Sequence, residues 1–305
     1  MADKDAHMAS LPFGLKSRPF VGRLGLVAPF RSPTQEAVRQ SLAATLAGEE
    51  NFTVLTGPQG VGKSLLVHRL VDSLRSEQPC LWVPAAPGTD VAGFLQTLLF
   101  ELNVDCQASS EAELRLALLN SLLQHAGTGC LLVVDDAHLL SSALFHELRW
   151  LAQLICPSGT LVHGVLIGEE ELSARLDEPS QQGVRPFLAS QSTLEPLLPE
   201  EAIDYVQHHL LQAGARPEQV MPLEACELLV RCAGGAPRLI NQLGSRALAL
   251  ACLAEADCID CEAVLAAAEE LGRADESELA AEAPVSLRVM VGAPRRGTVT
   301  ERRAG

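Results

Sequence analysis

A glycine-rich run at residues 57–64, Gly-Pro-Gln-Gly-Val-Gly-Lys-Ser, constrains the fold of this 305-residue chain more than any other feature. Its spacing is that of a phosphate-binding loop, in which glycines let backbone N–H groups converge on phosphate oxygens. In such a loop Lys63 reaches the β- and γ-phosphates, and the Ser64 hydroxyl binds Mg²⁺. The run therefore predicts a site for ATP and Mg²⁺ formed by Gly57, Pro58, Gln59, Gly60, Val61, Gly62, Lys63, Ser64 and Leu65.

The sequence on either side of this loop favours a functional site over a chance match. Residues 51–56 are apolar and β-branched, which predicts a buried strand. Residues 65–71 carry apolar side chains at helical spacing. A helix that begins at Gly62 or Lys63 directs its free N–H groups and the positive end of its dipole at the phosphates.

Strand-like and helix-like segments alternate through the first two thirds of the chain, which predicts an α/β fold with a parallel sheet covered on both faces. Helices are predicted near residues 90–103 and 110–125, and everything from Pro199 to about Leu271 is predicted to be helical. The predicted strands are residues 51–56, 80–84, 130–134, 160–167 and 192–197.

Two adjacent aspartates follow the fully apolar segment 130–134. Open α/β sheets bind ligands at the carboxyl ends of their strands, where this pair is placed. Asp135 is predicted to be the Walker B carboxylate, which holds Mg²⁺ through its water shell. The alternative is that Asp135 and Asp136 only cap the next helix.

Composition limits the compartment and the number of domains. With 48% hydrophobic residues, the chain is expected to bury one large and one small core. It shows neither a signal-peptide pattern nor an apolar run of about 18 to 20 residues, so we expect a cytoplasmic protein without a membrane span. Nine cysteines favour reduced thiols. Cys258 and Cys261 have metal-ligand spacing but no second pair nearby, and are interpreted as ordinary cysteines.

Charge is distributed unevenly along the chain. Residues 41–272 hold eleven Lys/Arg and thirty Asp/Glu, a balance of about −19, whereas both ends are slightly basic. Such an acidic body does not favour nonspecific binding of DNA, which depends on neutralising phosphates. Residues 1–12 are predicted to be flexible and residues 273–305 to form a disordered tail.

Several segments resemble the AAA+ ATPases of the ExeA type from general secretion pathways, which are related to the TnsC/TniB transposition ATPases. Residues 135–140, Asp-Asp-Ala-His-Leu-Leu, resemble the family's Asp-Glu-Ala-Gln segment. Residues 166–172, Leu-Ile-Gly-Glu-Glu-Glu-Leu, resemble its Leu-Val-Gly-Gln-Pro-Glu-Leu segment. Further matches lie at residues 13–15, 19–20, 194–197, 205–210, 213–214 and 234–241.

The resemblance covers about residues 13–272 and implies a fold and additional site residues. It implies a nucleotide-binding core at residues 13–197 with strand order 5-1-4-3-2, followed by a helical lid at residues 198–272. By resemblance, Arg238 is the sensor that reaches from the lid to the γ-phosphate. Phe20 or Val21 is expected to line the adenine pocket. Glu169 stands at a second sensor position, or is simply part of an acidic first turn of a helix.

Two departures from the family concern the rate of hydrolysis. Asp136 replaces the glutamate that polarises the attacking water, and its side chain is one methylene shorter. Phe187 stands where the family has an arginine before its last strand. Arg185 is the nearest substitute for this trans-acting arginine, and Arg175 and Arg149 are the other candidates. A finger of this kind contributes about 10³ to 10⁵ in rate.

These features predict an ATPase whose catalytic residues are Lys63, Asp135, Asp136, Arg238 and Arg185, with Mg²⁺ held by Ser64 and Asp135. If the arginine comes from a neighbouring copy, the site is complete only in a ring or filament. We therefore expect a homo-oligomer that assembles on ATP and remodels or regulates a protein partner, as in secretion or envelope assembly. One alternative is a DNA-linked regulator of the transposition type. Another is a nucleotide-gated switch with little hydrolysis, in which ATP and ADP present different surfaces.

Overall fold

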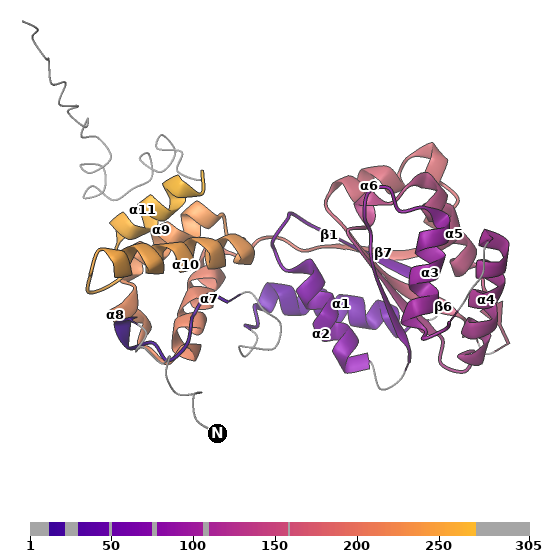
Figure 1. Cartoon of the computed structure of the whole chain (residues 1–305), viewed down its shortest axis with the longest axis horizontal. Coiled ribbons are helices and arrows are strands. Elements are labelled where there is room, and N and C mark those ends of the chain that lie inside the picture. The colour runs from indigo at the N-terminus through magenta and orange to yellow at the C-terminus, as the bar shows by residue number, and fades with distance from the viewer. Residues whose placement is uncertain are drawn as a thin grey trace, which may run out of the picture.

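The computed structural model describes residues 12–21, 30–48, 51–74, 78–105, 110–157 and 159–272. Two lobes are visible in Figure 1: an α/β core, and a bundle of helices formed by the last part of the described chain. The predicted tail at residues 273–305 and nearly all of the predicted flexible N-terminus lie outside the described residues. Among those described, no helix is both long and apolar enough to cross a bilayer.

The core is built on a five-stranded parallel sheet in the order β2-β3-β6-β1-β7. This order confirms the predicted 5-1-4-3-2 arrangement. Its strands are β1 (Phe52–Thr56), β2 (Cys80–Pro84), β3 (Cys130–Asp135), β6 (Val162–Ile167) and β7 (Leu188–Thr193). All five strands end at the same edge of the sheet, so the segments that follow β1, β3 and β6 are neighbours in space.

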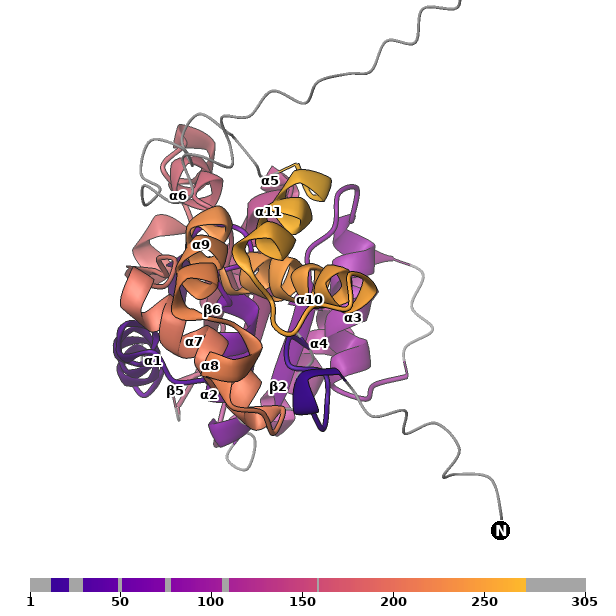
Figure 2. The same cartoon turned by 90° about the vertical axis from the view of Figure 1, so that its left-hand side faces the viewer.

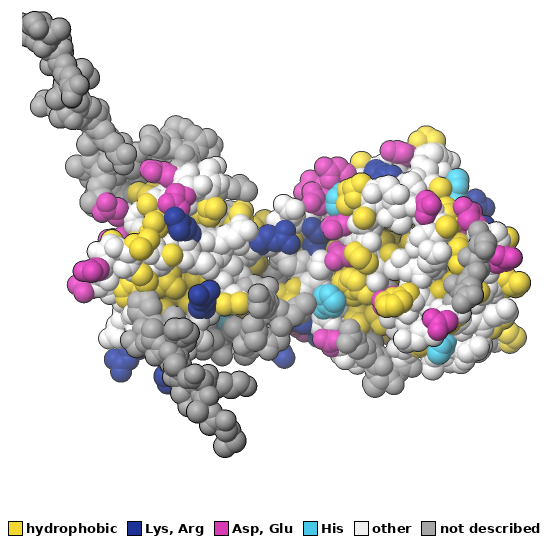
Figure 3. Space-filling model, in the orientation of Figure 1, with side chains coloured by type: hydrophobic (Ala, Val, Ile, Leu, Met, Phe, Trp, Pro, Cys, Tyr) yellow, Lys and Arg dark blue, Asp and Glu magenta, His cyan; other side chains and the backbone are white. Residues whose placement is uncertain are grey.

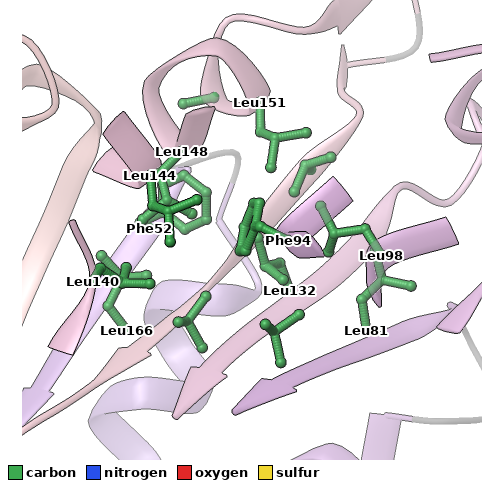
Figure 4. Packing of buried hydrophobic residues seen from close by; sticks show 14 of the residues in the cluster. Phe52, Leu81, Phe94, Leu98, Leu132, Leu140, Leu144, Leu148, Leu151 and Leu166 are labelled. Carbon is green, nitrogen blue, oxygen red and sulfur yellow. The ribbon is translucent and has the colours of Figure 1, made fainter. Parts of the chain in front are cut away.

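Helices cover both faces of the sheet, as the alternation of segments predicted. Strand β3 shows why, because its successive side chains point to opposite faces. Leu131 and Val133 join a fully buried cluster with α1 (Pro33–Leu46) and α2 (Lys63–Leu74). Leu132 and Val134 join the other cluster, which Figure 4 shows from close by. Its helices are α3 (Val91–Glu101), α4 (Glu111–Gln124) and α5 (Ser142–Ala152).

The last strand differs from its prediction. Strand β7 spans Leu188–Thr193, four residues earlier than the predicted 192–197. It is an edge strand whose side chains alternate between half-buried and exposed, so its polar sequence Leu-Ala-Ser-Gln-Ser-Thr does not stand out as a buried segment. The apolar residues Leu194 and Leu197 are buried, but they belong to the connection that follows β7.

The fourth strand of the sheet also begins later than predicted. The prediction of residues 160–167 included Thr160, which instead belongs to a separate two-stranded hairpin of β4 (Ile155–Cys156) and β5 (Gly159–Thr160). Strand β6 begins at Val162 and runs between β3 and β1. The other predicted strands and helices of the core lie within one or two residues of the observed elements.

The second lobe is a helical lid with its own hydrophobic core. It comprises α7 (Pro199–Gln212), α8 (Pro217–Val220), α9 (Leu223–Ala233), α10 (Pro237–Leu253) and α11 (Cys261–Glu270), which Figure 2 shows in front of the core. The N-terminal segment packs against this lobe, because the Lys16 N–H donates to the Ala213 carbonyl and the Phe20 ring joins the lid core. The family resemblance had implied that this segment belongs to the nucleotide-binding core at residues 13–197.

Close packing in the middle of the sheet leads to a first prediction. A Cβ on Gly164 of β6 would lie 1.9 Å from the backbone oxygen of Leu132. We expect Gly164→Ala to lower the free energy of unfolding by about 3 kcal/mol or more, because two backbones would have to separate. Chemical denaturation measures this loss. Gly127→Ala is the matched control, since a Cβ there meets nothing within 4 Å; equal losses for both variants would contradict the packing.

Candidate nucleotide-binding site

The glycine-rich loop lies where the sequence predicted, between the carboxyl end of β1 and the first residue of α2, Lys63. Gly57, Gly60 and Gly62 have φ values of 148°, 83° and 105°, which L-residues with side chains rarely adopt. A Cβ on Gly57 would also lie 2.2 Å from the carbonyl oxygen of Leu194. The loop therefore needs glycine both for its backbone conformation and for its approach to the segment after β7.

The Lys63 ammonium group is buried within this loop. Its side chain folds back so that Nζ donates to the carbonyls of Gly57, at 2.7 Å, and Pro58, at 2.8 Å. Burial lowers the pKa of Lys63, and nearby carboxylates oppose that shift. In order of effect, the carboxylates that raise its pKa are those of Glu169, Asp136 and Asp135. The charges of the predicted catalytic acids and of the second sensor candidate thus favour the protonated form of the predicted phosphate-binding lysine.

Ser64 and Asp135 meet beside the lysine, as the predicted Mg²⁺ site requires. Ser64 Oγ donates to Asp135 Oδ1 at 3.0 Å, although the two residues are 71 positions apart. Hydroxyl and carboxylate oxygens are ligands that Mg²⁺ prefers, so the donor set fits this ion. Asp136 follows in the left-handed conformation, with φ 53° and ψ 36°, and its side chain is exposed.

The lid contacts the loop directly through Arg238, the second residue of α10. Its backbone N–H donates to the Gly60 carbonyl at 3.1 Å. A Cβ on Gly60 would lie 2.9 Å from the Arg238 Cβ, so the two backbones are closely apposed. The Arg238 side chain is exposed and its charge acts on Lys63. In Figure 3 Lys and Arg side chains gather at the junction of the two lobes.

A second connection between loop and lid was not predicted. Gln35 of α1 donates from Nε2 to the Val61 carbonyl at 3.2 Å. At the start of the same helix, Glu201 of α7 accepts hydrogen bonds from Ser32 Oγ, Thr34 N and Thr34 Oγ1 at 2.7, 3.2 and 3.0 Å. Burial raises the pKa of Glu201, and these bonds together with one from the Leu198 N–H lower it by more. No local sequence signal pairs residues about 170 positions apart.

Of the two residues expected near adenine, Phe20 lies against the lid. Phe20 is 5% exposed. Its ring packs so closely on Gly244 of α10 that a Cβ added to this glycine would lie 2.8 to 3.0 Å from ring atoms. Ser245 donates from Oγ to the Phe20 carbonyl at 3.1 Å. Val21 is half-buried. Phe20 therefore belongs to the lid core, and any effect on adenine binding would depend on how it packs there.

The candidates for a trans-acting arginine have different surroundings. Arg175 donates to the carbonyls of His138 and Leu140 and lies over the Phe145 ring, 5.3 Å from its centroid, so it ties together elements of its own core. Arg185 is exposed and pairs with the carboxylate of Asp177, which is also exposed. Arg149 is exposed on α5, and Phe187 packs against the core cluster.

Comparison with known proteins agrees with this fold. Residues 46–176 match the AAA domain family. The chain also resembles solved structures, among them Cdc6p from Pyrobaculum aerophilum, with a TM-score of 0.68 and 16% identity. The match covers 83% of this chain and 70% of Cdc6p. Another is the ORC1 protein of Aeropyrum pernix in complex with DNA, with a TM-score of 0.63 and 19% identity over 86% and 72%. The chain therefore has the AAA+ fold, and its residues 46–176 resemble the AAA domain family.

A curated relative resembles the chain in sequence as well. It is general secretion pathway protein A from Aeromonas hydrophila, which is 28% identical over 204 residues. The match covers 65% of this chain and 36% of the relative, so the chain spans about a third of the length of the protein it matches. The motifs suggested a relationship to the ExeA-type proteins of general secretion pathways, and this match shows a distant one.

The buried lysine gives a second prediction. Replacing Lys63 with alanine should weaken ATP binding about tenfold to a hundredfold, because a charge-assisted hydrogen bond to phosphate contributes about 1.5–3 kcal/mol. Titration with a fluorescent ATP analogue in Mg²⁺ measures the change. Lys16 is an exposed lysine that lies against the lid. As a control, Lys16→Ala should bind ATP with an affinity within about twofold of that of the unaltered protein. Unchanged affinity in Lys63→Ala would show that the loop does not hold the phosphates.

Proposed function

We propose that this chain is an ATPase that binds ATP with Mg²⁺ and turns over slowly until it assembles with further copies. The observation that carries the proposal is the Ser64–Asp135 hydrogen bond of 3.0 Å beside a buried Lys63. It joins the two Walker segments at the sheet edge where α/β proteins bind ligands. The lid approaches the same loop through the Arg238–Gly60 bond.

The roles of the residues follow from their positions. Backbone N–H groups of the loop and Lys63 hold the phosphates, and Arg238 adds positive charge from the lid. Mg²⁺, held by Ser64 and Asp135, would neutralise charge on the phosphoryl oxygens. Asp136 is the group that orients the attacking water. Its side chain is shorter than glutamate by one methylene, and a displacement of about 1 Å can lower a rate about a hundredfold.

Arg185 is proposed to act in the site of a neighbouring copy. It lies three residues before β7, whose first residue pairs with Phe52 at the start of β1. The phosphate-binding loop follows the other end of β1, about 17 Å farther along a five-residue strand. Arg185 therefore lies near the amino ends of β7 and β1, whereas its own loop follows the carboxyl end of β1. An exposed arginine there is suited to a neighbour, which makes a homo-oligomer the complete enzyme.

The cellular role is proposed from the distant relative. General secretion pathway protein A is a protein of secretion, and we infer that this chain remodels or regulates a partner complex of the secretion or envelope-assembly type. The acidic balance of residues 41–272 gives no support to the DNA-linked alternative.

Mixing two inactive variants tests the shared site. Arg185→Ala should lower turnover by about 10³-fold or more with ATP affinity unchanged, because only the trans-acting charge is lost. Lys63→Ala is inactive for a different reason and retains Arg185. An equimolar mixture should regain part of the wild-type phosphate release, since each intact site meets an intact arginine.

Arg216→Ala, at an exposed arginine of the lid, is the control and should keep wild-type turnover. Phosphate release should also rise more than linearly with the concentration of unaltered protein. The shared site is wrong if Arg185→Ala is fully active or if the mixture stays inactive while both variants still assemble.

A nucleotide-gated switch is the second candidate, and the short side chain of Asp136 favours it. In that case the chain binds ATP and ADP in different conformations and hydrolyses little. Asp136→Glu should then raise steady-state turnover by up to about a hundredfold, because the longer side chain restores the position of the base. Asp136→Asn should not raise it. Brisk turnover by the unaltered protein would exclude the switch.

A further inference from the structure

Three side chains with metal-binding atoms converge beside the nucleotide site. They are His138 in the short helix η2 (Ala137–Leu139), Glu169 just after β6, and Glu171, the first residue of α6 (Glu171–Leu176). One ligand atom from each lies within 4.8 Å of the others. Among the residues that the structure describes, no other group of three His, Cys, Asp or Glu side chains meets this criterion.

The backbone around this cluster is held in place by contacts from outside it. Arg175 donates to the His138 and Leu140 carbonyls and so fixes η2 against α6. The Glu169 N–H donates to His138 Nδ1 at 3.4 Å. Gly168 allows the close approach, because a Cβ there would lie 2.8 Å from the Leu172 side chain and 3.3 Å from the backbone nitrogen of His138. The imidazole and the Glu169 segment therefore lie together, and a metal ion bound at Nδ1 would replace the Glu169 N–H as the partner of that nitrogen.

The donor set indicates which kind of ion would bind. One imidazole nitrogen and two carboxylate oxygens suit zinc and the related divalent transition metals, whereas magnesium prefers oxygen ligands alone. His138 and Glu169 both stand where the segments they resemble have glutamine, a weaker ligand than either. Three protein ligands leave a coordination position open to water.

We propose that His138, Glu169 and Glu171 form a binding site for a divalent transition-metal ion of the zinc class, separate from the Mg²⁺ site of Ser64 and Asp135. The site is half-buried at His138 and Glu169 and open to solvent at Glu171, so the ion has a path of entry. Its formation uses only the side chains of this chain and requires no nucleotide.

Occupancy of this site should change the nucleotide site, a consequence that rests on the proposed ATP-binding function. Glu169 follows β6, whose carboxyl end lies beside those of β1 and β3, so its negative charge is placed on the side of the sheet where the loop is proposed to hold the γ-phosphate. A bound cation neutralises that charge. The protein with metal should therefore prefer ATP over ADP more strongly than the protein without metal.

Zinc binding without nucleotide tests the proposal directly. Isothermal titration of the untagged chain with Zn²⁺ should show one site whose affinity falls at least about tenfold in His138→Ala and in Glu171→Gln. Glu170→Gln is the matched control, because this neighbouring exposed carboxylate is outside the cluster. Cys258→Ser/Cys261→Ser should leave the site intact.

Binding that survives His138→Ala overturns the proposal, and so does binding that disappears in the cysteine variant. Glu171→Gln binding as tightly as the unaltered protein would also overturn it. In a second titration at a buffered free Zn²⁺ concentration, the ratio of ATP to ADP affinity should rise in the unaltered protein and stay constant in His138→Ala. Because the first titration contains no nucleotide, a failure of ATP binding would be distinguishable from a failure of the metal site.

Discussion

Burial of the Lys63 ammonium is the interaction on which the arrangement of the sheet edge depends. A positive charge removed from water must be hydrogen-bonded and surrounded by negative potential, or it would lose its proton. Here two loop carbonyls accept hydrogen bonds from the ammonium, and the charges of three carboxylates at the ends of β3 and β6 favour its protonated form. That requires β1, β3 and β6 to be neighbours, which is what the observed strand order provides.

Much of the fold and of the candidate site could be predicted, because the sequence patterns that indicate them lie within short segments. The loop from Gly57 to Ser64 and the apolar segment before Asp135 each identify their element, and parallel strands place their carboxyl ends together. The edge strand β7 was placed too late because it is half-exposed, and the buried Leu194 that follows it carries the stronger apolar signal. The contacts of Glu201 with Ser32 and Thr34 join distant segments, so no pattern within a short window reveals them.

The two lobes are connected at neighbouring points of one loop. The Gly60 carbonyl accepts from the lid through Arg238, and the Val61 carbonyl accepts from Gln35, whose helix is bound to the lid through Glu201. A rotation of the peptide groups at these two positions would alter both connections together. The loop that is proposed to hold the phosphates is thus also the place where the orientation of the lid is set, and ligand binding can change that orientation only by its different affinity for the two arrangements.

The packing of Phe20 inside the helical lobe makes that lobe discontinuous along the chain. Its core contains the Phe20 ring together with side chains from Leu197 to Ala268, and Lys16 and Ser245 add hydrogen bonds between the two segments. The lobe is therefore completed by residues that precede the whole sheet in sequence. Cutting the chain between residues 197 and 198 would not yield two self-sufficient folding units, because the C-terminal fragment would expose the apolar surface that Phe20 covers.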